Sequence, residues 1–137
     1  MWRGVPAAAQ TSGNSISRGS IQTGSGARWP SGATPPMAKP VMLRTVWPIL
    51  ASPASDPVFA LFFEAGGLAA IGREPFRTLV PQLMEAWIEW AASLISGPRA
   101  RRRSEAEAAI ATLDGLLLMR LLAGPDVANR AARRLSM

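Results

Sequence analysis

A chain of 137 residues, 48% of them hydrophobic, is long enough to bury the core of one domain, and its formal net charge is +6. It contains no cysteine and no histidine, which excludes disulfides, thiol chemistry, imidazole-dependent triads and zinc sites of the Cys/His type. The sequence also shows no pair of carboxylates poised for acid–base chemistry. We therefore expect no catalytic residue, no metal site and no cofactor, and a protein that is not an enzyme.

Residues 1–55 differ in composition from the rest of the chain. Glycine, proline, serine and threonine make up 25 of them, and their few large apolar side chains follow no sustained period. This part carries five basic residues and no acid, whereas ten arginines nearly balance nine acids in the remainder. We expect most of this part to be unpacked, with a disordered or low-complexity tail over residues 1–43 and a folded domain over residues 44–137. Five scattered charges favour a solvated tail over a nucleic-acid-binding arm.

The first predicted helix occupies residues 55–72. Ser55 or Asp56 can cap it, and Pro57 can take its first position without losing a hydrogen bond. Apolar side chains then recur at helical spacing, and Gly72 is expected to end the helix.

The second predicted helix, residues 74–96, is the clearest amphipathic segment of the chain. Ten apolar side chains follow the i, i+3, i+4, i+7 pattern, so one face must be covered by other elements. Pro81 removes a backbone donor, and we expect a kink or a new helix start there. Gly97 and Pro98 are expected to stop the helix.

Two further helices follow. Ser104 and Glu107 have the spacing of a capping box, which predicts a helix from there to Ala123, and a short last helix begins at Pro125. Four arginines precede the capping box, and without an aromatic residue or a second basic run they indicate a solvated loop more than a nucleic-acid patch: Arg99, Arg101, Arg102 and Arg103. Four helices with short connections predict an all-α helical bundle.

The dipeptide Asp114-Gly115 is a hairpin signal inside this pattern. Its flanks are rich in alanine, glutamate and leucine, which favour a helix, so we expect the helix to continue through it. That helix has two apolar faces. One consists of Ala106, Ile110, Leu113, Leu117 and Leu121, and the other of Ala108, Ala111, Gly115, Leu118 and Leu122.

Two apolar faces on one helix predict two packing partners. Four helices cannot easily cover both, so we expect a homodimer in which a second copy crosses closely near Gly115. Asp114 would lie at the edge of this contact and need an arginine or a tryptophan indole as donor. The alternative is that Gly115 admits a close contact within the chain and Asp114 points to water.

The apolar stretches do not predict a membrane span. Asp114 and Arg120 interrupt the longest one, and Glu64 interrupts a shorter one, whereas a bilayer requires about 20 mostly uncharged residues. The first ten residues carry a positive charge without the apolar region of a secretory signal. We expect a cytoplasmic protein without membrane contacts.

Three segments together resemble the C-terminal domain of the tetracycline-repressor (TetR) family of bacterial transcriptional regulators: DPVFALFFEAGGLA, LVPQLMEAWIEWAASLI and AIATLDGLLLMRLLAGPDVANRAARRL. The resemblance rests on the LFFE segment, the Glu85-Ala86-Trp87 pattern and the Asp-Gly-Leu-Leu-Leu run, and it covers residues 44–137. It implies an all-helical domain that binds a small apolar effector and dimerises through its last two helices.

The resemblance also implies site residues. The ligand pocket would be lined by Phe59, Phe62, Phe63, Met84, Trp87 and Trp90. The dimer interface would use Ala111, Gly115, Leu118, Leu122, Val127 and Ala131. An ordinary hydrophobic core explains the aromatic set equally well, because pockets and cores are lined by the same residue types.

The chain departs from this family at its N-terminal end. A three-helix DNA-binding head is expected there, yet residues 1–43 contain no paired amphipathic helices and hold four prolines between Pro30 and Pro40. We therefore expect DNA binding to be absent or impaired, because the head was lost or because a frame disruption or misplaced start replaced it. The alternative function is a headless interaction module that heterodimerises with intact relatives.

Overall fold

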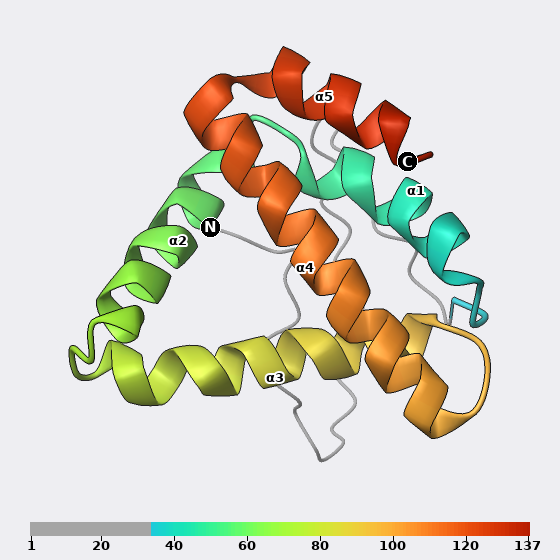
Figure 1. Ribbon diagram of the computed structural model, residues 1–137, viewed down its shortest axis with the longest axis horizontal. Helices are drawn as coiled ribbons and strands as arrows, with labels where there is room; N and C mark the ends of the chain where they lie inside the picture. Colours follow the sequence, from blue (N-terminus) through green and yellow to red (C-terminus); the bar gives the residue numbers. More distant parts are fainter. Residues whose placement is uncertain (1–33) are drawn as a thin grey trace, which may run out of the picture.

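The computed structural model describes residues 34–137, and these residues form five helices and no strand (Figure 1). The helices are α1 (Lys39–Leu50), α2 (Asp56–Ala70), α3 (Phe76–Leu94), α4 (Arg99–Ala123) and α5 (Pro125–Arg134). The all-α prediction is confirmed for this part of the chain. The expectation of a disordered tail concerns residues that lie mostly outside the described range.

Helix α4 is the centre of the fold and packs against each of the other four helices. It runs diagonally across the molecule in Figure 1, with α2 and α3 on one side and α1 and α5 on the other. The side of α4 that faces the core carries six buried apolar residues: Ala106, Ala109, Ile110, Leu113, Leu116 and Leu117. The first apolar face predicted from the sequence is therefore the core face.

Helix α1 was not predicted, and it crosses the boundary that we set at residue 44. Pro40 lies in its first turn, where a missing N–H costs no hydrogen bond, and Pro48 lies near its end. After Pro40 the apolar residues repeat at helical spacing up to the end of the helix and are buried: Met42, Leu43, Val46, Trp47 and Leu50. The folded part thus begins earlier than expected, because these prolines sit at positions a helix tolerates.

The segment before α1 is hydrogen-bonded to the end of α3, and the turn between α2 and α3 contains the expected helix stop. The backbone N–H of Met37, just before α1, donates to the carbonyl of Leu94 at 2.8 Å. Gly72 adopts a φ of 79° after α2, as its predicted role as a helix stop requires. Helix α3 starts at Phe76 and continues through Pro81, so Pro81 does not begin a new helix.

The arginine cluster belongs to α4 and is not a loop. Pro98 starts the helix from an extended conformation, and the hydroxyl of Ser104 donates to the carbonyl of Arg101 at 3.0 Å instead of capping. Arg103 donates to Glu85 of α3 at 2.8 Å and to Glu107 of its own helix at 3.1 Å. These acids offset the unfavourable position of a cation near a helix N-terminus.

A buried ion pair joins α4 to the start of α2. The guanidinium of Arg120 donates to both carboxylate oxygens of Asp56, at 2.7 and 3.0 Å. The Arg120 side chain is 6% exposed and that of Asp56 is 33% exposed. Arg120 is the one buried charged residue of the described chain, and no local sequence pattern indicates its partner.

We expect Asp56→Asn to lower the free energy of unfolding by about 3 kcal/mol, because it leaves a buried guanidinium without its counter-charge. Arg120→Met should cost less, since the carboxylate that remains is partly reached by water. Urea denaturation of both variants at one protein concentration measures the two losses. The exposed pair of Arg77 and Glu74 provides the control, because Glu74→Gln should change stability little. A loss for Asp56→Asn no larger than that of the control would contradict a structural role for the pair.

Candidate functional site

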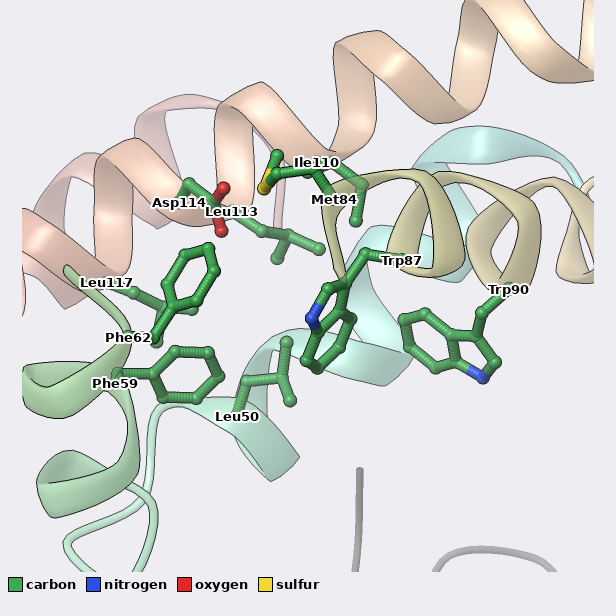
Figure 2. A pocket seen from close by; sticks show the side chains of 10 residues that line it. All are labelled: Leu50, Phe59, Phe62, Met84, Trp87, Trp90, Ile110, Leu113, Asp114 and Leu117. Atoms are coloured by element: carbon green, nitrogen blue, oxygen red, sulfur yellow. The ribbon is translucent and has the colours of Figure 1, made fainter. Parts of the chain in front are cut away.

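A small cavity lies between α2, α3 and α4, with one residue of α1 at its border (Figure 2). Its free volume is about 10 Å³, which is close to the space that one water molecule needs. The lining residues are Leu50, Phe59, Phe62, Met84, Trp87, Trp90, Ile110, Leu113, Asp114 and Leu117. In this conformation the cavity is closed to any organic molecule.

Helical spacing explains how each helix contributes to this lining. Phe59 and Phe62 lie three residues apart on α2, and Met84, Trp87 and Trp90 follow the same interval on α3. Residues at this interval share one side of a helix. Each lining residue of α4 also lies three or four positions from two others: Ile110, Leu113, Asp114 and Leu117. One face of each of the three helices therefore borders the cavity.

Five of the six residues predicted to line a pocket lie together in this cavity. The sixth, Phe63, is not part of the lining; it packs at the border of the core and meets the ring of Phe62 edge-on, with centroids 5.3 Å apart. The rings of Trp87 and Trp90 make a similar edge contact at 5.6 Å. The structure brings these residues together, while ligand binding there stays a prediction.

Asp114 does not lie where the sequence analysis expected it. Its half-buried carboxylate points into the cavity beside Phe62, with Leu113 and Met84 nearby (Figure 2). It makes no hydrogen bond or ion pair with any residue of the described chain, so neither the expected arginine nor an indole donates to it. Burial raises the pKa of the Asp114 carboxyl to about 6.

The position of Asp114 could have been found from its register. It follows Leu113 directly and lies four residues after Ile110 and three before Leu117, all on the core side of α4. From the sequence we expected Asp114 at the edge of the dimer contact or pointing to water. The other nine lining residues of the described chain carry no titratable group, so Asp114 is the one charged residue that residues 34–137 contribute to the cavity.

The residues predicted for a dimer interface divide into two groups. Ala111, Gly115, Leu118 and Leu122 are exposed on α4, and the exposed fraction of Leu122 reaches 79%. Val127 and Ala131 of α5 are half-buried, and Ala131 packs against the core. Together with exposed Ala108, the four α4 residues form what we call the α4 stripe: Ala108, Ala111, Gly115, Leu118 and Leu122.

Gly115 makes no close contact with another segment of residues 34–137. A Cβ atom built at this position would find no heavy atom of another described segment within 4 Å. The alternative that Gly115 serves a close crossing inside the chain is therefore wrong for the described structure. The small residues of the α4 stripe face open space.

No family model, no curated protein and no solved structure matches this chain. Residues 34–137 contain no helix long and apolar enough to cross a membrane. The same residues hold no cluster of three or more metal-ligating side chains. The cavity and the α4 stripe are the two features of these residues on which a function can be based.

We expect Asp114→Asn to stabilise the protein at neutral pH. A carboxyl whose pKa is raised by folding destabilises the folded state when it is charged, and protonation removes that cost as the pH falls through about 6 toward 4. A shift of about two pKa units corresponds to an upper limit of about 3 kcal/mol. Urea denaturation at several pH values measures the difference between variant and parent.

The exposed acid Glu89 on α3 supplies the matched control, since Glu89→Gln removes the same charge outside the cavity. The advantage of Asp114→Asn should shrink from pH 7 to pH 4, while Glu89→Gln should show no comparable trend. A constant difference across this range would show that Asp114 is not desolvated.

Proposed function

We propose that this chain is an effector-binding and dimerisation module of a transcriptional regulator, of the kind that the TetR-like segments imply. The observation that carries the proposal is that one helix serves both sites. On α4, Asp114 faces the cavity, and its neighbour Gly115 faces solvent within the α4 stripe. An occupant that displaces α4 therefore displaces the dimerisation surface with it.

The packing around the cavity supports its use as a binding site. Between Ala60 and Trp90 no residue is fully buried, although this segment supplies Phe62, Met84 and Trp87 to the lining. Half-buried side chains lose less packing when they rotate than fully buried ones. The closed cavity can thus open on its α2 and α3 side at a modest cost.

The α4 stripe supports self-association. Leu118 and Leu122 expose apolar surface, and Ala108, Ala111 and Gly115 leave room for a second helix to approach closely. In a symmetric dimer the same stripe meets its own copy, so one surface serves both partners. The half-buried Val127 and Ala131 of α5 would lie beside this contact rather than at its centre.

A headless module that pairs with intact relatives would use the same stripe. The two functions differ in whether the chain associates with itself. Under the first, the isolated protein is a homodimer; under the second, it remains a monomer until a relative is added. In both, the described helices make no direct contact with DNA.

We expect Gly115→Leu to shift the protein from dimer to monomer, because a leucine would hold the two copies of α4 apart. The variant should fold, since no described neighbour lies within 4 Å of a Cβ atom at this position and leucine favours a helix over glycine. Sedimentation velocity across micromolar concentrations measures the change in association.

Gly67→Leu is the matched control. Gly67 is also an exposed glycine inside a helix, with nothing within 4 Å of its built Cβ, but it lies on α2 away from the stripe. This variant should dimerise like the parent. A parent protein that sediments as a folded monomer, or a Gly115→Leu variant that assembles normally, would count against the proposed interface.

A further inference from the structure

The cavity contains a charge that the fold does not compensate. The half-buried carboxylate of Asp114 has no hydrogen-bond donor and no cation within the described chain, although arginines elsewhere in the same helix pair with acids. Burying a carboxylate without a partner costs stability. A neutral side chain of similar size would avoid that cost, so Asp114 is explained better by a bound partner than by folding.

The chemistry of the cavity distinguishes between three classes of occupant. An anion would be repelled by Asp114. A neutral apolar molecule would exclude the water that still reaches the carboxylate and leave it less solvated than before. A cation would supply the missing counter-charge, and its attraction to a carboxylate strengthens as water is excluded.

The aromatic lining favours the same class. Phe59, Phe62 and Trp87 extend toward the space below Asp114 in Figure 2. Aromatic faces attract cations, and tryptophan does so most strongly. A positively charged group beside the carboxylate is therefore also attracted by the aromatic rings, while the same rings and Leu113 accommodate an apolar body.

We infer that the effector is a small organic cation, an amine or ammonium group on an apolar body, whose charge pairs with Asp114 and whose body lies against Phe62 and Trp87. This inference rests on the proposed effector-binding function. Because the cavity holds only about 10 Å³ when closed, the occupant must displace Met84 or an aromatic ring as it enters. Methionine is well suited to this, since its flexible side chain repacks easily.

Acidification should abolish this selectivity. The pKa of Asp114 is raised to about 6, so below that pH its carboxyl is mostly neutral. No titratable side chain from α1, α2 or α3 lines the cavity with it, and Arg120 on α4 is already paired with Asp56. Loss of cation binding on mild acidification would therefore report Asp114.

The test compares three benzene derivatives of similar size: protonated benzylamine, neutral benzyl alcohol and anionic benzoate. Each is titrated into the full chain up to millimolar concentration, and the indole N–H resonance of Trp87, assigned from its loss in Trp87→Phe, reports occupancy. We expect benzylamine to bind about tenfold more tightly than benzyl alcohol near pH 7.5, and benzoate to bind most weakly. Benzylamine stays protonated near pH 5, where its advantage should vanish.

Asp114→Asn should remove the preference for benzylamine, and Glu89→Gln should retain it, because both variants lose one negative charge but only the first loses it in the cavity. Equal binding of benzylamine and benzyl alcohol, unaffected by Asp114→Asn, would overturn the cation assignment and leave the effector-binding function standing. If none of the three compounds shifts the Trp87 resonance, both the cation assignment and the role of the cavity as an effector site fail.

Discussion

The ion pair between Arg120 and Asp56 sets the register of α2 against α4. Because a buried guanidinium cannot leave its carboxylate without a large penalty, the first turn of α2 is held opposite Arg120. From this pair, each turn further along α2 lies opposite a turn closer to the start of α4. Phe59 therefore lies near Leu117, and Phe62 lies near Asp114 (Figure 2). This ion pair thus helps to determine which residues of α2 and α4 line the cavity.

Two aspartates thus lie on one interface in opposite electrostatic situations. Asp56 receives two hydrogen bonds from Arg120, whereas Asp114, about two turns away along α4, receives none. The fold compensates the acid that fixes its geometry and leaves the acid in the cavity uncompensated. Local violations of folding rules concentrate at functional sites, and this contrast is the physical reason to propose the cavity, rather than the arginine-rich surface, as the binding site.

Helical periodicity was sufficient to predict α2, α3 and the apolar faces of α4, because each depends on local spacing. The five predicted residues that line the cavity came from the resemblance to the TetR family, and the structure brings them together without testing whether they bind a ligand. The prediction failed for α1, because the glycine-, proline-, serine- and threonine-rich composition of residues 1–55 indicated an unpacked segment, although Pro40 and Pro48 occupy positions that the helix tolerates. It also failed for the start of α4, since the acid that stabilises Arg103 lies on α3. The Asp56–Arg120 pair and the environment of Asp114 depend on contacts distant in sequence, which no local pattern contains.

Under the proposed function, the arrangement of α4 limits how an occupant of the cavity would affect the α4 stripe. Its core side and the α4 stripe belong to one continuous helix, so an occupant that pushes on Leu113 and Asp114 moves Gly115 and Leu118 as a rigid body. Close helix crossings over small residues are sensitive to such displacements, because the approach of the backbones depends on interdigitated side chains. Because the Asp56–Arg120 pair holds α4 near one end, the proposed movement would be a rotation of the whole helix about that end, which displaces Ala111 and Gly115 more than Arg120.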